Sequence, residues 1–328
     1  QKMSRITRHR WGKGFSYRRN NGETVRDRKL RRWCASLAIP PAWTDVEIDL
    51  DGDARVHATG RDAAGRKQYI YNPAWRESRE QEKYDRIIRF AQRLSAMRRI
   101  TGQHLRRHDN SREKVLACMV RLIDTAYFRP GNAQYAAENE SYGLTTMRSK
   151  HLTIEGDELI FRYTGKSGQF QEKHVEDKRL AHIVAELNHI PGREIFKYFD
   201  SDGNKVDVVS DDLNAYIHEI MGEDFSAKDF RTWAGTSLAA LALDALGVAD
   251  NVKQAEANIR EAIRSVAQRL GNTPAIAKAS YIDPRVTDCY LDGRTLQYFR
   301  EAVEEELEEG MVSPAERAVL KLLQSRLG

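Results

Sequence analysis

The chain contains a tyrosine, two arginines, a lysine and an asparagine whose types and order suit chemistry on a phosphate group. A phenol has a pKa near ~10 and is a poor nucleophile at neutral pH unless cations stabilise its anion. Arginine and lysine supply such cations, and they also bind phosphate oxygens. In chain order these candidate residues are Arg129, Lys166, Arg231, Asn272 and Tyr281. Taken singly, each has a plainer interpretation as a surface charge, a turn residue or a packing side chain.

Tyr281 lies in a short predicted helix within the segment RLGNTPAIAKASYIDPRV. Gly271 ends the preceding helix, since a residue without Cβ suits the position past the last turn. Thr273 and Pro274 start the next one, because a hydroxyl caps a helix and proline loses no hydrogen bond at the first helical position. Pro284 disfavours helical geometry just before it. The chain therefore builds a short helix that presents a phenol.

Arg129 and Lys166 lie at turns where a side chain can reach a ligand. Arg129 ends a strongly apolar helix and precedes a Pro-Gly turn, so its planar fork of donors leaves a rigid element at a fixed point. Lys166 lies between glycines in YTGKSGQF, where the backbone can come close to a ligand and the ammonium supplies charge and a proton. The triplet GKS lacks the spacing of a nucleotide-binding P-loop and leads into a strand, which argues against that kind of site.

Arg231 lies in FSAKDFRTWAG, where Ser226 and Asp229 have the spacing of a helix capping box. This spacing puts Lys228 and Arg231 on one face of the first turns, at the positive end of the helix dipole, where anions bind readily. A salt-bridged helix surface is the plainer alternative. Asn272 adds an amide that can donate a hydrogen bond to a phosphate oxygen but cannot titrate.

The composition is that of a soluble globular protein, with 41% hydrophobic and 31% charged residues among 328. No apolar run approaches the ~20 residues that a membrane span requires, so no membrane partner is expected. No secretory signal is visible in the sequence. The three cysteines, Cys34, Cys118 and Cys289, have neither metal-ligand spacing nor the pattern of a disulfide framework. We therefore expect a reducing, intracellular location and no metal site.

Residues 1–80 carry 18 Lys and Arg against 10 Asp and Glu, an excess of +8, whereas the rest of the chain is slightly acidic. Such an excess predicts a polyanionic partner such as nucleic acid, bound with salt-dependent affinity; a solvated surface is the alternative. The same residues are predicted to be β-rich. The segment GKGFSYRRNNGETV predicts a hairpin that turns at Asn-Gly, a helix is expected over 25–37, and three more short strands over 44–72.

From about residue 81 the pattern changes to that of helices, with apolar residues at helical spacing in YDRIIRFAQRLSAM and KVLACMVRLIDTAYF. The segment HLTIEGDELIFRYTGKSGQFQEKHVE instead alternates apolar and polar residues and predicts three short antiparallel strands. The expected fold class is α+β, with a β-rich amino-terminal domain in residues 1–80 and a mainly α-helical catalytic domain in 81–328 that contains the small three-stranded sheet. Further helices are expected over 177–189, 211–221, 227–246 and 252–270, and again from 295.

These motifs and their order resemble the small type IB DNA topoisomerases of bacteria and poxviruses, which share a catalytic domain with the tyrosine recombinases. The resemblance extends from about residue 43 to residue 286. It implies that Arg129, Lys166 and Arg231 are the catalytic cations and that Tyr281 is the nucleophile. Asn272 stands where poxvirus enzymes and recombinases usually carry histidine. The segments that carry the resemblance are AWTDVEIDLDGDARVHATGRDAAGRKQYIYNPAW, YGLTTMRSKHL, YTGKSG, KDFRTWAGT and LGNTPAIAKASYIDPRV.

The resemblance also implies DNA contacts and a reaction. Gln68, Tyr69 and Tyr71 resemble the amino-terminal strand that touches DNA in the major groove, and Lys228 is expected to contact DNA. The implied activity is relaxation of supercoiled duplex DNA by single-strand cleavage through a 3′-phosphotyrosine and religation, without ATP, a cofactor or an obligatory metal. Lys166 is then the proton donor to the departing 5′-oxygen. The implied protein is a monomer that clamps duplex DNA between its two domains, in the cytoplasm at the nucleoid.

Two alternatives stay open. A tyrosine recombinase would share the catalytic domain and the covalent intermediate. Recombinases typically show H-x-x-R where this chain has KDFR, and a helical amino-terminal domain where this one is predicted to be β-rich. A non-catalytic DNA-binding clamp would have the same basic amino-terminal domain but no need for all the candidate residues. Relaxation of a supercoiled plasmid in EDTA separates a topoisomerase from such a clamp.

Overall fold

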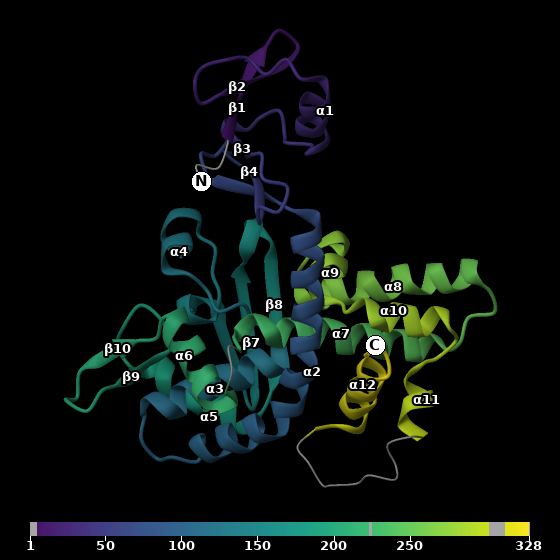
Figure 1. Cartoon of the computed structure of the whole chain (residues 1–328). Coiled ribbons are helices and arrows are strands. Elements are labelled where there is room, and N and C mark those ends of the chain that lie inside the picture. The colour runs from purple at the N-terminus through teal and green to yellow at the C-terminus, as the bar shows by residue number, and fades with distance from the viewer. Residues whose placement is uncertain (1–4, 223–224, 302–311, 328) are drawn as a thin grey trace. The chain divides into compact units, whose positions relative to one another are not determined.

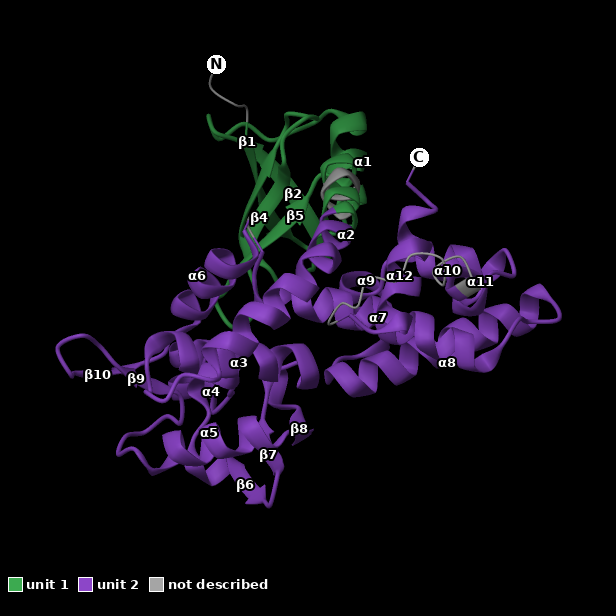
Figure 2. Ribbon diagram, turned by 90° about the horizontal axis from the view of Figure 1, so that it is seen from below, with its two compact units in different colours: residues 1–85 green, residues 86–328 purple. Residues whose placement is uncertain are grey.

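The computed structural model describes residues 5–222, 225–301 and 312–327 (Figure 1). The chain divides into two compact units, Gln1–Asp85 and Arg86–Gly328 (Figure 2). Each unit has a hydrophobic core of its own. The two units are described separately below.

The first unit is built on a five-stranded sheet in which all neighbouring strands are antiparallel, in the order β2-β1-β3-β4-β5. One helix, α1 (Arg28–Ser36), begins at Asp27, whose carboxylate accepts two backbone N–H groups of the first turn. Sheet and helix together bury the core of this unit, which includes Ile6, Ile48 and Cys34. The strands are β1 (Arg5–Trp11), β2 (Gly14–Arg19), β3 (Thr44–Asp49), β4 (Val56–Arg61) and β5 (Lys67–Tyr71).

The first hairpin departs from the sequence prediction. Strands β1 and β2 are joined at Gly12 and Lys13, and the predicted Asn-Gly turn comes after β2. The chain beyond that turn makes one bridge, between Arg18 and Thr24, and no strand. Strand β1 was missed because its side chains are mostly charged or polar and Ile6 alone among them is buried; pairing with β2 and β3 on its two sides holds it in the sheet.

The second unit is mainly helical and contains two small sheets. The three-stranded antiparallel sheet, ordered β6-β7-β8, has strands β6 (Leu152–Glu155), β7 (Glu158–Thr164) and β8 (Phe170–Glu176). A two-stranded sheet that was not predicted has strands β9 (Lys197–Phe199) and β10 (Lys205–Asp207). The helices are α2 (Pro73–His104, which begins in the first unit), α3 (Arg112–Ala126), α4 (Ala133–Asn139), α5 (Lys178–His189), α6 (Ser210–Met221), α7 (Ala227–Leu246), α8 (Val252–Leu270), α9 (Pro274–Tyr281), α10 (Pro284–Leu291), α11 (Leu296–Glu301) and α12 (Pro314–Gln324), with single 3-10 turns η1 (Leu144–Thr146), η2 (Ser149–His151) and η3 (Lys166–Gly168).

The predicted fold class is confirmed: a β-rich amino-terminal region is followed by a mainly helical part with a small three-stranded antiparallel sheet. Helices α5, α6, α7 and α8 begin and end within one residue of the predicted bounds. The helical carboxyl end is confirmed in α11 and α12, whereas residues 302–311 lie outside the described residues.

Helix α3 leads into the candidate site from the centre of the second unit. Apolar side chains surround most of α3, and nearly all of them are buried, as a helix that is hydrophobic all round requires. The helix stops at Tyr127, whose φ of 60° is in the left-handed region, and Phe128 is fully buried directly after it. The position of Arg129 is therefore fixed by the packing of the residues just before it.

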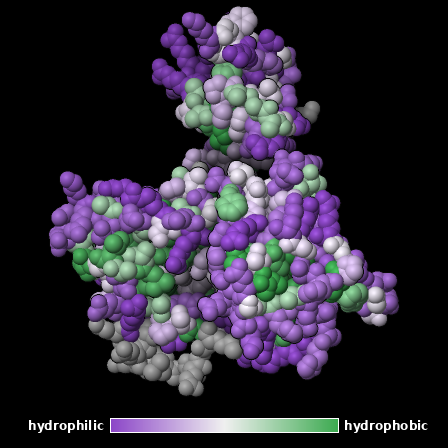
Figure 3. All heavy atoms as spheres, turned by 180° about the vertical axis from the view of Figure 1, so that it is seen from behind, coloured by the Kyte–Doolittle hydropathy of each residue, from purple (hydrophilic) through white to green (hydrophobic). Residues whose placement is uncertain are grey.

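Hydrophilic side chains cover most of the face seen in Figure 3, with smaller hydrophobic areas between them. Exposed aromatic side chains occur in both units, for example Trp11 in the first and Phe170 in the second. Within the described ranges, no helix has the length and apolar character needed to cross a membrane.

Candidate active site

The carboxyl end of α8 brings the two predicted arginines together. Arg231 donates from Nη2 to the carbonyl oxygen of Leu270 at 2.8 Å and from Nη1 to that of Tyr127. Arg129 donates from Nη2 to the carbonyl oxygen of Gly271 at 3.3 Å. Because the last carbonyls of a helix carry partial negative charge, they attract cations. Residues more than a hundred positions apart thus meet at one helix end.

Asn272 lies directly beside Arg129. Its Oδ1 accepts a hydrogen bond from Arg129 Nη2, which fixes the orientation of the amide, because a guanidinium can only donate. The Nδ2 group of Asn272 is buried and has no hydrogen-bond partner in the described structure, and the same holds for Nε of Arg231. A buried donor without a partner is costly. The site therefore holds two buried donors ready for an anionic oxygen.

Tyr281 ends α9, as the sequence predicts. Thr273 caps this helix by accepting from the backbone N–H of Ile276, and the helix stops before Asp283 and Pro284. Helix α9 packs against α7 and α8. The Tyr281 ring lies beside Arg231, whose Cζ is 5.0 Å from the ring centroid. The short helix therefore brings the phenol to the arginine pair.

The phenol of Tyr281 is easier to ionise than an ordinary tyrosine. Burial by itself raises its pKa, but the charge and hydrogen bond of Arg231 and the charges of Arg129 and Lys228 outweigh burial. The net effect is a pKa below the usual 10.0. The pKa of Arg231 is lowered as well, by burial and by the charge of Arg129. A cationic pocket of this kind is what an attacking phenolate needs.

Helix α7 also holds the backbone of Tyr281, through two residues that sequence reasoning missed. Thr236 Oγ1 donates to the carbonyl oxygen of Tyr281 at 3.2 Å and accepts from the N–H of Asp283 at 3.1 Å. A Cβ at Gly235 would lie 2.6 Å from the carbonyl oxygen of Tyr281 and 2.8 Å from its Cβ. The glycine within a strongly helical stretch was the available signal, because such a glycine often marks close packing.

Lys228 and Asp229 are neighbours at the start of α7 that differ in burial. Lys228 is exposed, and its charge reaches Tyr281. Asp229 is buried and accepts from the N–H and hydroxyl of Ser226, as the capping-box prediction requires, and it forms a 2.6 Å ion pair with Arg86. The carboxylate is therefore structural, and of the two basic residues of KDFR it is Arg231 that lies beside Tyr281.

Lys166 is not in contact with the other candidate residues. It lies in η3 at the exposed tip of the β7–β8 hairpin, and none of the described side chains forms a hydrogen bond or ion pair with its ammonium. Close to this tip, however, the buried side chain of Gln171 on β8 packs against the end of α8: the position of a Cβ at Gly271 would be 2.0 Å from its Oε1. The hairpin therefore lies against the helix end that holds the two arginines.

Lys173, also on β8, is a further cation that the sequence did not indicate. It is only 9% exposed, and its Nζ donates to the carbonyl oxygen of Arg269 at 2.7 Å. Burial and the charges of Arg231 and Arg129 lower its pKa to about 8. Nothing in the alternating pattern of β8 distinguishes it from an ordinary strand residue.

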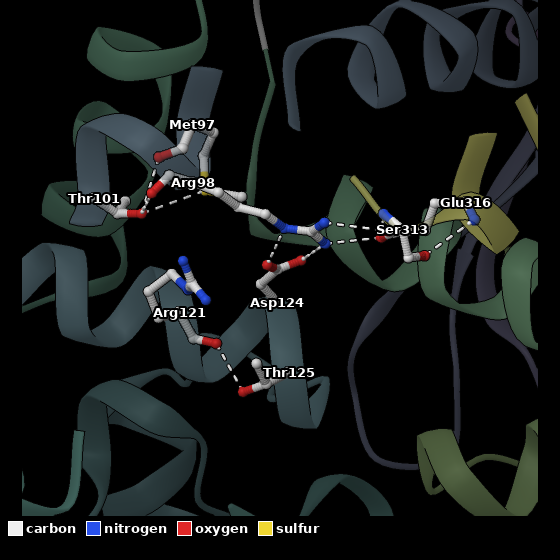
Figure 4. A network of polar contacts seen from close by, with 8 residues as sticks. All are labelled: Met97, Arg98, Thr101, Arg121, Asp124, Thr125, Ser313 and Glu316. Carbon is white, nitrogen blue, oxygen red and sulfur yellow. Dashed lines mark hydrogen bonds and ion pairs between the residues drawn. The ribbon is translucent and has the colours of Figure 1, made fainter. Parts of the chain in front are cut away.

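A paired arginine fixes the end of α3 that leads to Arg129 (Figure 4). Arg98 of α2 contacts Asp124 of α3 at 2.8 Å and Glu316 of α12 at 2.8 Å. Burial alone would raise the pKa of Glu316, but the hydrogen bond and charge of Arg98 hold that pKa below 4.5. The network therefore joins three helices by charge-assisted hydrogen bonds.

The predicted DNA-reading residues lie on β5, an edge strand of the sheet in the first unit. Tyr69 and Tyr71 are exposed on one face, with ring centroids 6.0 Å apart and nearly parallel planes. Gln68 points to the other face by strand alternation, and its Nε2 donates to Asp62 at 2.9 Å. The structure thus brings the two tyrosines together but leaves Gln68 apart from them.

Comparisons with known proteins agree with this arrangement. A family model described as "Eukaryotic DNA topoisomerase I, catalytic core" matches residues 72–307, and one described as "Bacterial DNA topoisomerase IB, N-terminal domain" matches residues 14–62. The chain is 33% identical over 289 residues to DNA topoisomerase 1B of Acanthamoeba polyphaga mimivirus, with 85% of each chain covered. It is 25% identical over 271 residues to DNA topoisomerase 1B of vaccinia virus (strain Copenhagen), with 78% of this chain and 80% of the viral one covered.

Fold, site and matches define an isomerase that acts on DNA. More narrowly, the chain belongs to the type IB DNA topoisomerase family. The predicted resemblance is thereby confirmed at the level of the family.

Proposed function

We propose that the protein relaxes supercoiled duplex DNA by cutting one strand, holding its end on Tyr281 as a 3′-phosphotyrosine, and resealing it. The observation that carries this proposal is the phenol of Tyr281 beside Arg231, with buried, unpartnered donors on Arg231 and Asn272. Such donors match the oxygens of a phosphodiester, which gain negative charge as phosphorus becomes pentacoordinate.

In the cleavage step the oxygen of Tyr281 attacks phosphorus, its proton passes to solvent, and the bond from phosphorus to the 5′-oxygen breaks. Arg129 and Arg231 stabilise the charge on the non-bridging oxygens, and Asn272 donates from Nδ2. Lys166 gives a proton to the departing 5′-oxygen, because an alkoxide is a poor leaving group. Religation is the reverse, with the 5′-hydroxyl attacking the phosphotyrosine. One phosphodiester is exchanged for another, so the reaction needs no ATP, and side chains supply the cations that a metal would otherwise provide.

DNA binding is the second part of the proposal. The first unit contains residues 1–80 with their basic excess and an exposed tyrosine pair on β5, so we assign it to sequence-independent phosphate contacts and groove contact. Residues 81–328 are assigned to catalysis, with Lys228 contacting the backbone near the cut. A monomer that engages the duplex with both units, at the nucleoid in the cytoplasm, is the form that we propose.

A plasmid assay tests this function. Supercoiled DNA is incubated with the protein in EDTA and without ATP, and we expect full relaxation of positive and negative supercoils alike. Retention of the plasmid on the protein without any change in its topology would instead support a non-catalytic clamp.

A further inference from the structure

Three successive carbonyl groups at the end of α8 each hold a different cation. Lys173 Nζ donates to the oxygen of Arg269, Arg231 to that of Leu270 and Arg129 to that of Gly271. Lys173 comes from β8, and the arginines come from α7 and the segment after α3. The end of α8 thus supplies the carbonyl groups that bind all three cations.

None of these three cations has a carboxylate as an ion-pair partner among the described residues. Two other buried cations of the second unit do have one: Lys114 pairs with Glu186 at 3.4 Å, and Arg285 pairs with Asp283 at 2.8 Å. Lys197 is buried without a carboxylate partner, but it stands alone and not in a cluster of cations. Burying a cation without a counterion costs free energy, and close positive charges add to this cost. A pocket with such an excess is electrostatically complete only when it holds an anion.

The surroundings of Lys173 place its positive charge close to the candidate active site. It lines a cavity of about 770 Å³ beside the active site together with Asn272 and Gly271. Burial, together with repulsion from Arg231 and Arg129, lowers the pKa of its ammonium to about 8. The other titratable groups lining this cavity are Tyr127 after α3, Glu172 and His174 on β8, and Arg269 on α8.

We propose that Lys173 is a positioning residue of the cleavage reaction: it fixes the last turn of α8, on which Arg129 and Arg231 are held, and its charge strengthens the field on the phosphate. This inference rests on the proposed function. The proposal requires both the hydrogen bond to Arg269 and the positive charge. Arginine at position 173 should therefore preserve cleavage, and methionine should not.

The chain offers a matched control in Lys197. This lysine is 1% exposed, its Nζ donates at 2.8 Å to the carbonyl oxygen of Ile190 at the end of α5, and its pKa is likewise lowered by burial. Lys197→Met therefore removes the same kind of buried ammonium from the same kind of helix end, but away from the arginine pair. A purely structural role of Lys173 predicts equal effects of the two methionine substitutions.

The experiment measures single-turnover cleavage of a suicide duplex, DNA affinity and thermal stability for Lys173→Met, Lys173→Arg and Lys197→Met. We expect Lys173→Met to slow cleavage about 10- to 100-fold, since small misplacements of catalytic groups have effects of this size, with DNA affinity changed less than about threefold. Lys173→Arg should stay within about fivefold of the wild type, and Lys197→Met should cleave at the wild-type rate. Equal rates for both methionine variants would overturn the proposal.

A pH series decides the question if Lys173→Met does not fold. Lysine loses its charge as pH rises through its pKa, whereas arginine keeps its charge. The ratio of the wild-type to the Lys173→Arg cleavage rate should therefore fall as pH rises above about 8, while the titration of Tyr281 affects both proteins alike. A ratio that stays constant from pH 7 to pH 10 would refute the role of the charge. Failure of the wild type to form any adduct would instead count against the proposed function itself.

Discussion

The positive charges of arginines inside the second unit are accommodated in two different ways, by carboxylates or by backbone carbonyl groups. Arg98 lies between the carboxylates of Asp124 and Glu316, at 2.8 Å from each (Figure 4). Arg129 and Arg231 donate to backbone carbonyls instead, and in the part of the chain that the structure describes neither forms an ion pair with a carboxylate. The first cluster has a net charge of −1, one arginine against two carboxylates, whereas the second keeps its positive charge.

This difference separates a structural charge from one available to a ligand. Two carboxylates more than offset the charge of Arg98, and their bonds to it make α2, α3 and α12 depend on one another. Carbonyl groups orient a guanidinium without neutralising it, and they leave Nε of Arg231 and Nδ2 of Asn272 without partners. Unneutralised charge at a buried site is expected where function requires it. The comparison can be tested by disturbing each cluster in turn.

The largest effect is expected from Tyr281→Phe. Relaxation and adduct formation should be lost completely, because the removed hydroxyl makes the new bond, whereas DNA affinity should stay within a few-fold, since binding is spread over many phosphate contacts. Plasmid relaxation and a filter-binding titration measure the two properties. Adducts formed by the phenylalanine variant would show that the nucleophile is a different residue.

Lys166→Ala should slow cleavage about 10²–10⁴-fold, the usual contribution of proton donation to a poor leaving group. A substrate with sulfur in place of the bridging 5′-oxygen needs little protonation and should restore most of this rate. Arg129→Ala and Arg231→Ala should gain little from it, because their contribution is electrostatic. Equal rescue of all three variants would show that Lys166 is not the general acid.

Gly235→Ala should slow cleavage about 10²-fold, because the added methyl displaces the backbone of Tyr281, and misplacement by about 1 Å has effects of this size. Gly102→Ala in α2 is the matched control, since a Cβ there meets nothing within 4 Å. It should leave cleavage unchanged and stabilise the helix by about 0.4–1 kcal/mol. Rapid-quench kinetics and thermal unfolding give both quantities; wild-type cleavage by Gly235→Ala would contradict the close packing.

Asp124→Asn should act on stability and hardly on chemistry. Arg98 keeps its ion pair with Glu316 but loses its charge-assisted hydrogen bonds to Asp124, so the free energy of unfolding should fall by about 1.5–3 kcal/mol. The cleavage rate per folded molecule should fall by less than it does in Lys166→Ala or Gly235→Ala. Asp109→Asn, at an exposed ion pair with Arg107, should leave stability unchanged in the same urea titration. If Asp124→Asn lost cleavage but not stability, the Arg98 cluster would not be purely structural, and the comparison of the two clusters would be wrong.

Glu316 gives the smallest effect, and this effect disappears in acid. Its pKa in the folded chain lies below 4.5, so its contribution is complete above that pH and is lost as pH falls through the lowered value. Glu316→Gln should therefore reduce stability at neutral pH and flatten the loss of stability below pH 4.5. Unfolding titrations between pH 3 and pH 7 measure this slope, and identical slopes for both proteins would contradict the assignment.

The sequence predicts elements and nearby residues well, and distant contacts poorly. Helix α9 follows from Thr273, Pro274 and Pro284, because caps and prolines act locally. The two tyrosines on β5 follow from the family resemblance. Lys173 was missed because its partner Arg269 is 96 residues away, and a lysine in an alternating strand carries no signal of burial. The pairing of Arg98 with Glu316, 218 residues apart, is invisible for the same reason.

The most direct test of the cationic pocket as a site of phosphotyrosine chemistry is to trap the wild-type protein on a suicide duplex and identify the linked residue by mass spectrometry. The charge comparison predicts one adduct, on the peptide that contains Tyr281, joined to a DNA 3′-phosphate. An adduct on a 5′-phosphate, on another residue, or no adduct under conditions where the duplex is bound would contradict it.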